Sequence, residues 1–427
     1  MTTASCPPQG YVVDWAGLPI DLLACVSRLL CPVPGRVCFR AVCRSWRAAD
    51  DLQHDGHPDP VASMPPPWLV IPLGLGCPDT FTLLSLLTMQ AFRWTPPGGA
   101  RIRCVGSSGG WIAGAYIDAA QKVRVSLLNP LTGARVDVPA PVRRVWFSPG
   151  DESGMRDKEE ISLCSAVQKV AFSPSPTRRD FAVAVLTRTR GGGKAVAFTR
   201  AGCSGWCAVA DVGPFEPGGD HVRAQLDVAY HGGKFYYMTM RAEVWAVDMA
   251  APRPSPARVA RFEPAVLGLV YRRHHLAFTG DCELHVVCSS IHHSESSGVD
   301  MVALRYDDPS RAGGSSSSAA AAWSEATCLR GQTFLIGDMN QTLCVRAGDG
   351  AWLRPDSVYF TNIPLCEVFA ESRRGGSGGA WVLDLPTGDI TRPSSKDAAG
   401  KYIRNEREQR AWGLNYSKCA WLMPSML

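Results

Sequence analysis

The sequence predicts a small all-α module followed by an all-β domain, which we interpret as a β-propeller of six or seven blades. Three observations lead to this prediction. Apolar residues recur at helical spacing between residues 18 and 47. From residue 68 onward, short apolar runs rich in valine and aromatic residues alternate with turn-forming residues, as in strands. Turn segments of similar sequence then recur at intervals that fit a propeller repeat.

The bulk composition is typical of a folded globular chain. The 427 residues are 46% hydrophobic and 19% charged, which suits a small module and one large domain. The net charge of +5 is low for this length, and no block of Lys and Arg stands out, so we expect no nucleic-acid partner. The most apolar window, residues 68–89, is interrupted by Pro, Gly and Asp, so we expect no membrane span.

Composition divides the chain into four parts. We expect a disordered leader at residues 1–10, the helical module at 11–50, a Pro-rich linker at 51–67 and the β domain at 68–427. The 16 cysteines have no regular spacing, and the first basic residue is Arg28, so the charged start of a secretory signal is missing. These features favour reduced thiols in a cytoplasmic or nuclear protein.

The helical module is predicted to contain two or three short helices. Apolar residues of the first helix recur at Leu18, Leu22, Val26, Leu29 and Leu30. Pro19 suits a first helical turn, and the segment Pro32–Gly35 ends the helix. A second periodic run contains Phe39, Val42, Cys43 and Trp46. A module this small rarely closes its own core, so the surplus apolar face predicts a protein partner.

These residues resemble the F-box. That family opens with Leu-Pro, continues with two leucine pairs and closes with Arg-x-Val-Cys-Arg-x-Trp-Arg. The matching segments here are Leu18-Pro19, Leu22-Leu23, Leu29-Leu30 and Arg40–Arg47. One departure is the Pro-Val-Pro-Gly run, which replaces the usual polar residue before the second helix and leaves its start open. A helical hairpin buried against its own chain is the alternative.

The resemblance implies docking onto a Skp-family adaptor and, through it, onto a cullin-based ubiquitin ligase. The residues expected to bind the adaptor are Leu18, Pro19, Leu22, Leu23, Val26, Leu29, Leu30, Val42 and Trp46. Affinity should be concentrated in a few such apolar anchors.

The β domain shows many short strand-like runs and few helical patterns, which argues against a parallel sheet with crossover helices. The clearest runs are Trp68–Ile71, Phe81–Thr88, Trp111–Ile117, Val123–Leu128, Phe181–Thr187, Ala195–Thr199, Phe235–Met240, Val244–Val247, Leu284–Cys288, Val358–Thr361 and Trp381–Leu385. Three polar or glycine-rich segments, residues 148–159, 309–322 and 371–379, are expected to be exposed loops.

Repeated turns favour a propeller over other large β folds. The segment Leu128–Gly133 (LNPLTG) matches Leu383–Gly388 (LDLPTG), and Asp248 likewise follows an apolar run. The intervals from Asn129 to Asp248 and from Asp248 to Asp384 are 119 and 136 residues. One third of each is about 40–45 residues, the length of a four-stranded blade. Other multi-sheet β folds remain an alternative.

The β domain also resembles the β-propeller that follows the F-box in a large family of plant F-box proteins of undefined function. The residues that carry this resemblance are Leu128–Gly133, Asp227–Asp248, Asp356–Asn362 and Trp421–Met426. The resemblance implies a fold and an architecture, and it implies no catalytic residues.

Three patterns that could carry chemistry are better explained as structure. The segment Gly106–Gly110 matches Gly-x-Ser-x-Gly, but a strand follows it where a hydrolase needs a helix. Cys282, His285, Cys288 and His292 have spacings seen in zinc sites, but alternation along a strand would turn His285 away from the two cysteines. Cys203 and Cys207 are expected in a turn. We therefore expect no catalytic, cofactor-binding or metal-binding residue.

The leading hypothesis is a non-enzymatic, substrate-recruiting subunit of a ubiquitin ligase, in which the module binds the adaptor and propeller loops bind a target protein. A scaffold or regulatory protein whose F-box engages no ligase is the second hypothesis. An enzyme built on a propeller, with a ligand in the central channel, is the third. The sequence does not identify the target.

Overall fold

The architecture is described from a computed structural model. It describes residues 15–30, 35–51, 67–72, 79–85, 91–99, 101–139, 141–142, 167–188, 194–213, 226–239, 241–261, 273–292, 298–308, 322–337, 339–347, 353–360, 381–391 and 420–423. The chain divides into two units, Met1–Pro65 and Pro66–Leu427. Within the described ranges, no helix is long and apolar enough to cross a membrane.

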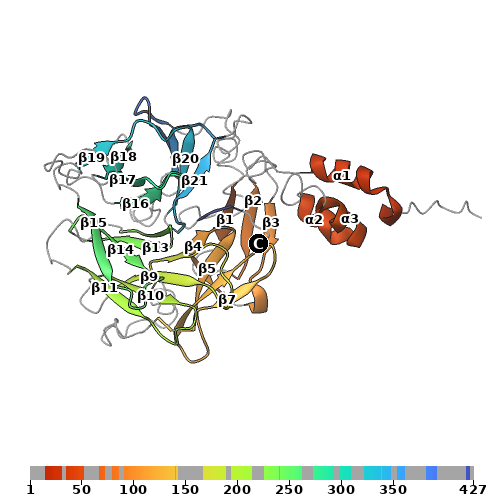
Figure 1. Ribbon diagram of the computed structural model, residues 1–427, viewed down its shortest axis with the longest axis horizontal. Coiled ribbons are helices and arrows are strands. Elements are labelled where there is room, and N and C mark those ends of the chain that lie inside the picture. The colour runs from red at the N-terminus through yellow and green to blue at the C-terminus, as the bar shows by residue number, and fades with distance from the viewer. Residues whose placement is uncertain are drawn as a thin grey trace, which may run out of the picture. The chain divides into compact units, whose positions relative to one another are not determined.

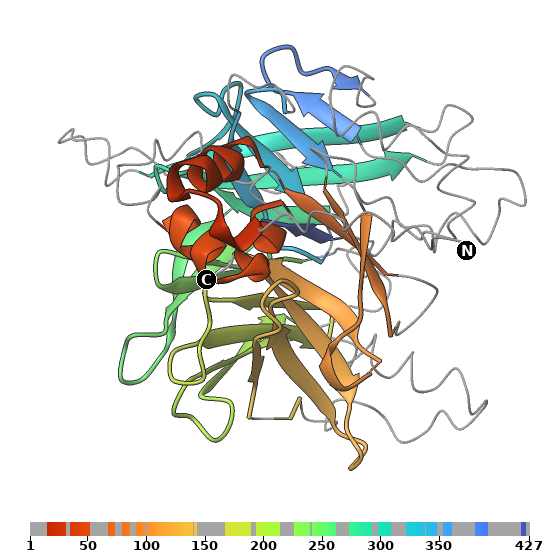
Figure 2. The same cartoon turned by 90° about the vertical axis from the view of Figure 1, so that its right-hand side faces the viewer.

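The first unit consists of short helices packed on one another (Figures 1 and 2). They are η1 (Trp15–Gly17), α1 (Ile20–Leu29), α2 (Gly35–Val42) and α3 (Arg44–Asp51). Pro19 precedes α1 as its N-cap, and its carbonyl accepts hydrogen bonds from the backbone N–H groups of Leu22 and Leu23. The described part of the second helix runs from Gly35, the last residue of the Pro-Val-Pro-Gly run, whose first three residues lie outside the described residues.

The described strands of the second unit form six sheets that follow one another around a ring (Figure 1). The strands of the first three blades are β1 (Trp68–Pro72), β2 (Phe81–Ser85), β3 (Ala91–Trp94), β4 (Arg103–Ser108), β5 (Trp111–Ile117), β6 (Val123–Leu128), β7 (Arg135–Asp137), β8 (Lys169–Phe172), β9 (Ala182–Arg188), β10 (Lys194–Arg200) and β11 (Ala208–Gly213). A short 3-10 helix, η2 (Pro97–Gly99), follows β3.

The strands of the other three blades complete the ring. They are β12 (Val228–His231), β13 (Lys234–Met238), β14 (Glu243–Asp248), β15 (Pro256–Arg261), β16 (Arg273–Phe278), β17 (Leu284–His292), β18 (Gly298–Asp307), β19 (Ala322–Glu325), β20 (Gln332–Ile336), β21 (Leu343–Arg346), β22 (Ser357–Phe360), β23 (Trp381–Asp384), β24 (Ile390–Thr391) and β25 (Ala420–Leu422). The long strands β17 and β18 are the teal pair in Figure 2. A helical module followed by a six-bladed β-propeller confirms the predicted fold class, with the lower of the two blade numbers.

The ring is closed by strands from opposite ends of the sequence. The first blade has the order β25-β1-β2-β3, and Leu69 of β1 pairs with Trp421 of β25. The next four blades have the orders β4 to β7, β8 to β11, β12 to β15 and β16 to β19. The last blade, β21-β20-β22-β23-β24, contains a parallel pair, β20 with β22. One strand of each blade contacts one strand of the next blade. These strands are, in order around the ring, β25, β4, β8, β12, β16 and β21, and they are therefore the inner strands.

The repeated turn found in the sequence has the same structure in two blades. The Asn129 side chain accepts hydrogen bonds from the N–H groups of Leu131 (2.9 Å) and Thr132 (3.1 Å) between β6 and β7. Asp384 accepts from Thr387 N (3.2 Å) between β23 and β24. Both turns end in a glycine with positive φ, 71° at position 133 and 73° at position 388. The capping side chain and the final glycine explain why this short motif recurs.

The Gly-x-Ser-x-Gly match is a hairpin between β4 and β5, as predicted. Gly109 and Gly110 have φ values of 52° and 84° and form its turn. Gly106 lies within β4, where a Cβ atom would be 2.2 Å from the Val170 carbonyl oxygen of the neighbouring blade. This glycine therefore permits close packing of two inner strands. The predicted loops at 148–159 and 371–379, and 309–322 except Ala322, lie outside the described residues.

Candidate partner-binding surfaces

The first helix, α1, has one buried and one exposed stripe. Leu23 and Ser27 are four residues apart, and only 1% and 3% of their surfaces are exposed. Leu22 and Val26 are also four residues apart, and they are 53% and 39% exposed. Because residues at this spacing share a helix face, α1 closes the module with one face and presents apolar side chains on the other.

The predicted adaptor-binding residues fall into several groups. The exposed ones are Pro19, Leu22, Val26 and Val42. The partly buried ones, which pack against the module core, are Leu18, Leu30 and Trp46. Leu23 belongs to that core together with Phe39 and Ala49, so it cannot contact a partner while the module is folded. Leu29 lies in α1, but its side chain is outside the described residues.

Two exposed apolar residues were missed by the sequence reasoning. Ile20 is 44% exposed and Trp15 is 60% exposed. Ile20 lies off the periodic positions that begin at Leu18, and Trp15 precedes the motif. Their exposure is set by the turn of α1 after Pro19 and by η1, and neither can be found from spacing alone.

A buried carboxylate holds the three helices in register. Asp50 in α3 is 1% exposed and accepts hydrogen bonds from the Ser27 hydroxyl of α1 and from Arg40 Nη1 of α2, the latter at 2.9 Å. Asp51 accepts a second bond from Arg40 at 2.5 Å. Asp51 and Asp50 raise the pKa of Arg40 above its usual value by hydrogen bonding. The exposed stripe of α1 therefore lies on a fixed frame.

Trp46 is half-buried and contributes to that frame. Its ring lies 4.6 Å from the ring of Phe39, centroid to centroid, and its Nε1–H donates to the Trp15 carbonyl at 2.9 Å. A tryptophan with a satisfied indole N–H and a partly exposed face can both pack internally and contact a partner.

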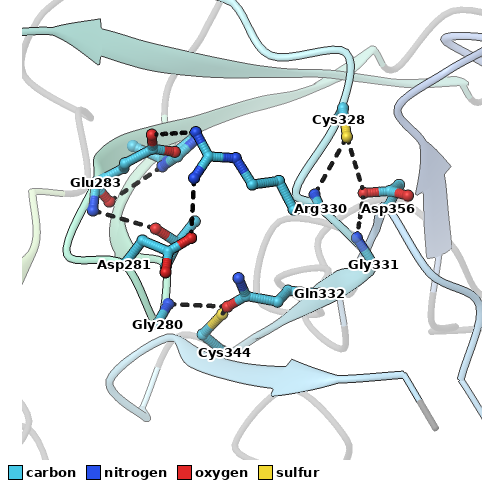
Figure 3. Close-up of polar contacts among 11 residues, drawn as sticks. Gly280, Asp281, Glu283, Cys328, Arg330, Gly331, Gln332, Cys344 and Asp356 are labelled. Carbon is cyan, nitrogen blue, oxygen red and sulfur yellow. Dashed lines mark hydrogen bonds and ion pairs between the residues drawn. The ribbon is translucent and has the colours of Figure 1, made fainter.

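In the propeller, a cluster of polar loop contacts joins the fifth and sixth blades (Figure 3). Arg330, in the connection between β19 and β20, donates to Asp281 at 3.0 Å and to Glu283 at 2.9 Å. Both carboxylates belong to the turn between β16 and β17. Arg330 and Asp281 are exposed and Glu283 is partly buried, and because solvent screens such ion pairs, each contributes little stability. Their value is in fixing two loops together.

The same loop cluster contains backbone conformations that only surrounding contacts can hold. Cys282, Arg330 and Asp356 have φ values of 61°, 56° and 51°, which are unfavourable for residues other than glycine. The Asp356 carboxylate accepts hydrogen bonds from Leu329 N at 2.6 Å and Gly331 N at 3.0 Å. The turn conformations are thus fixed by named hydrogen bonds.

A glutamine connects the two blades beneath these charges. The Gln332 side-chain oxygen accepts from Gly280 N and from the Cys344 thiol, both at 2.8 Å (Figure 3). Burial raises the pKa of the Cys344 thiol to about 12, so it remains a neutral donor. The cluster is a rigid polar platform on the propeller rim.

The inner strands are connected by two adjacent amide side chains between β20 and β21. Gln341 donates from its backbone N–H to Ser107 (3.2 Å) and from its side chain to Phe172 (3.2 Å), and it accepts from Tyr230 N. These partners belong to the second, third and fourth blades. Asn340 donates to the Leu335 carbonyl at 3.2 Å and accepts from Trp421 N at 3.4 Å. Two residues therefore bond to five blades.

A buried ion pair forms a second connection between inner strands. The Lys169 ammonium of β8 contacts the Asp227 carboxylate, and their side chains are 4% and 2% exposed. Asp227, which directly precedes β12, also accepts from Val228 N at 2.8 Å and from Leu276 N of β16 at 2.9 Å. One carboxylate thus joins the third, fourth and fifth blades.

Of the residues with zinc-like spacing, His285, Cys288 and His292 lie on β17, whereas Cys282 lies in the turn before it with a φ of 61°. Cys288 packs into an apolar cluster with Val286, whereas the His285 ring meets Phe334 at 5.4 Å, centroid to centroid. The two side chains thus leave β17 in opposite directions. Among the described residues, no group of three or more His, Cys, Asp or Glu is arranged to hold a metal ion. Cys203 and Cys207 lie in the turn between β10 and β11.

Solved structures with similar folds are remote. The chain is similar to TolB from Acinetobacter baumannii, with 11% identity over 82% of this chain and 70% of that chain and a TM-score of 0.39. It is also similar to the Cps50 (Swd1) β-propeller domain of Myceliophteria thermophila, with 10% identity over 76% and 85% of the two chains and a TM-score of 0.35. None of these likenesses bears on function.

A third similar structure is a putative 6-phosphogluconolactonase from Bacteroides fragilis, with 10% identity over 79% of this chain and 83% of that chain and a TM-score of 0.35. No curated protein sequence matches the chain. The family model of the KIB1-4 beta-propeller, however, matches residues 83–391, which is most of the chain and lies within the ring described above. The chain therefore belongs to the KIB1-4 beta-propeller family.

Proposed function

We propose that this chain is a non-catalytic, substrate-recruiting subunit of a cullin-based ubiquitin ligase, active in the cytoplasm or nucleus. Its helical module binds a Skp-family adaptor, and its propeller binds a target protein. The observation that carries the proposal is the exposed apolar stripe of α1, whose other face is closed into the module's own core.

The free energy of the proposed binding comes from burying exposed apolar side chains against the adaptor. Fully burying a Leu or Val side chain is worth about 1.5–3 kcal/mol. Leu22 is 53% exposed, Val26 is 39% exposed and Val42 is 54% exposed. Because the Asp50 hydrogen bonds already fix the helices, little ordering entropy is lost when these side chains enter pockets on a partner.

The propeller supports a protein-interaction role, because its loops are mounted on a rigid ring. The Arg330 platform is an example of loops held in one conformation by cross-blade bonds. A target held there would be brought near a ubiquitin-conjugating enzyme on the same assembly. Proximity raises the effective concentration of acceptor lysines and needs no catalytic residue in this chain.

The test removes only exposed side chains. We expect the Leu22→Ala, Val26→Ala double variant to lose adaptor affinity by at least about tenfold, since hot-spot truncations cost about 1–4 kcal/mol. Binding of purified Skp-family adaptor by isothermal calorimetry measures this. Leu23 is left unchanged because its truncation would unfold the module rather than test the surface.

The matched control is Val209→Ala in β11, where an equally exposed valine (56%) lies on the propeller. Its affinity for the adaptor should equal that of the unaltered chain. Equal binding by the double variant would contradict the proposed surface. Failure of the unaltered chain to bind any Skp-family adaptor would favour a scaffold or regulatory protein outside a ligase.

A further inference from the structure

Two free cysteines lie in contact on the rim of the third blade. Cys203 and Cys207 belong to the turn between β10 and β11, and their Sγ atoms are 3.2 Å apart. Cys207 is exposed and Cys203 is half-buried. A disulfide bond is about 2.05 Å long, so the two sulfur atoms need to approach by only about 1 Å.

Both ends of this turn are fixed by backbone hydrogen bonds. Cys203 N donates to the Arg200 carbonyl at 3.2 Å, and Cys207 N donates to the Phe198 carbonyl at 2.8 Å. The Thr199 hydroxyl donates to the Gly205 carbonyl at 2.8 Å, across the turn. These bonds hold the thiols together through the backbone, so closure requires side-chain movement and no refolding of β10.

One of the three residues between the thiols connects this turn to the neighbouring blade. Trp206 packs against the core shared by the second and third blades, and its Nε1–H donates to the Pro141 carbonyl at 3.0 Å. A covalent link between Cys203 and Cys207 would therefore close a small ring around an inter-blade anchor. The proposed adaptor surface does not include these two thiols.

We propose that Cys203 and Cys207 form a reversible disulfide when the protein meets a peroxide. One thiol loses its proton, and the thiolate attacks an oxygen of hydrogen peroxide; the O–O bond breaks, a sulfenic acid forms, and the leaving hydroxide takes up a proton and departs as water. The second sulfur attacks the sulfenic sulfur, the S–S bond forms, the S–O bond breaks, and a second water leaves. Two thiols lose two electrons in total, and one peroxide is reduced to two waters.

Either thiol can make the first attack, and the attacking sulfur must be a thiolate. Burial, and then the neighbouring Cys203 thiol, raises the pKa of Cys207 above its ordinary value. The reaction should therefore be faster above pH 8 than at pH 7.

The sequence makes the product simple to detect. Trypsin cleaves after Arg200 and next after Arg223, and peptide 201–223 contains these two cysteines and no others. After the folded full-length protein is treated with hydrogen peroxide, alkylated and digested without reductant, this peptide should lose the mass of two hydrogen atoms. It should carry no alkyl group, and dithiothreitol should restore two alkylation sites.

Serine variants separate a disulfide from other oxidation. In Cys207→Ser and in Cys203→Ser the sulfenic acid on the remaining cysteine has no resolving thiol, so dimedone should trap it in both variants and should trap little in the unaltered chain. Cys38, an exposed cysteine of α2, is the internal reference for simple peroxide reactivity. Circular dichroism of both variants verifies that they are folded.

Two results would overturn the proposal. One is full alkylation of both thiols in peptide 201–223 under conditions that oxidise Cys38. The other is a gain of two or more oxygen atoms at either cysteine with no loss of hydrogen, since over-oxidation in place of a disulfide means that the resolving step is absent.

Discussion

At the scale of single residues, Asp227 shows how one buried charge can order several blades. Its carboxylate contacts Lys169 of β8 and accepts N–H bonds at the start of β12 and within β16. A buried ion pair is weak evidence for net stability, because both charges lose hydration. Removing only one of the two charges is nevertheless costly to stability, because the remaining charge stays buried without a partner.

We therefore expect Lys169→Met to lower the free energy of unfolding by about 3–5 kcal/mol. The double variant Lys169→Met, Asp227→Leu should recover part of that loss. Urea denaturation followed by tryptophan fluorescence measures both. Arg305→Gln is the control, because Arg305 and Asp307 form an exposed pair at 3.0 Å, and its loss should change stability by less than about 1 kcal/mol. A similar small change for Lys169→Met would show that the buried pair is not needed.

A buried histidine, His275, and its half-buried neighbour, His274, predict acid sensitivity of the propeller. Burial lowers the pKa of His274 to about 4 and the pKa of His275 well below its usual value. Nearby Lys169 lowers the pKa of His275 further. In the described structure, neither ring nitrogen of His275 has a hydrogen-bond partner, and its ring lies edge-on to Phe360 at 5.4 Å. Both histidines are therefore neutral in the folded state.

The sign of the pH effect follows from these lowered pKa values. Below about pH 6.5 the two histidines bind protons in the unfolded chain but not in the folded chain. The stability present above pH 6.5 is therefore lost as the pH falls toward 4. Each unit of pKa depression corresponds to about 1.4 kcal/mol. The midpoint of urea unfolding, measured between pH 7.5 and 4.5, should fall, and His275→Phe should make that fall smaller. An equally steep fall in His275→Phe would exclude this histidine as a cause.

At the scale of elements, two adjacent residues of α1 have different roles: one stabilises the helical module, and the other is exposed for the proposed adaptor contact. Leu23 is 1% exposed and Leu22 is 53% exposed. Truncating a buried leucine costs about 2–5 kcal/mol, whereas truncating an exposed one costs about 0.5 kcal/mol or less. Leu23→Ala should thus unfold or loosen the module while Leu22→Ala leaves it intact.

Hydrogen exchange of the α1 amides in the full-length chain measures this difference. Exchange at residues 24–29 should become faster by roughly 30-fold or more in Leu23→Ala, since each 1.4 kcal/mol of lost stability is about tenfold in the opening equilibrium. Leu22→Ala, which truncates the exposed neighbouring leucine, is the matched control. Equal protection in the two variants would mean that the Leu23 contact does not hold α1 in the module.

The elements were predictable where local rules determine them. The strands Trp111–Ile117 and Val123–Leu128 have the same bounds in the sequence and in the structure, because uniform apolar runs end at turn residues. The turn at Asn129 was predictable from its own side-chain chemistry. The strand Pro256–Arg261 was missed, because it is an outer strand with mostly exposed side chains and no apolar alternation.

The candidate sites were predictable only in part, for a related reason. Spacing identified Leu22 and Val26 as one stripe, but it could not tell that Leu23 faces inward, since this depends on where α2 and α3 lie. The bonds made by Asn340, Gln341 and Asp227 join residues far apart in the chain. No periodic pattern marks them, because each depends on the closed ring and not on its own strand.

At the scale of the whole molecule, the propeller depends on the pairing of β1 with β25. Trp421 of β25 is fully buried, pairs with Leu69 and donates from Nε1 to the Ile336 carbonyl of the sixth blade at 3.1 Å. Trp421→Ala should lower the free energy of unfolding by about 3–5 kcal/mol, because a large buried side chain that contacts both the first and the sixth blade is lost.

A chain ending at residue 419 should lose the cooperative unfolding transition altogether, whereas a chain ending at residue 423 keeps β25 and should unfold as the full chain does. Differential scanning calorimetry distinguishes these outcomes. A cooperative transition of unchanged temperature in the shorter chain would show that β1 and the sixth blade hold the ring without β25.

The same closure sets an order of events during synthesis. The ribosome delivers β1 at residue 68 and its partner only at residue 420, a delay on the order of tens of seconds at typical translation rates of about 5–20 residues per second. Throughout that interval the nascent chain carries an unpaired strand edge, which invites wrong pairing and chaperone capture. The translation rate of the later codons, and the supply of chaperones while they are translated, should therefore affect the yield of this protein more strongly than events early in its synthesis.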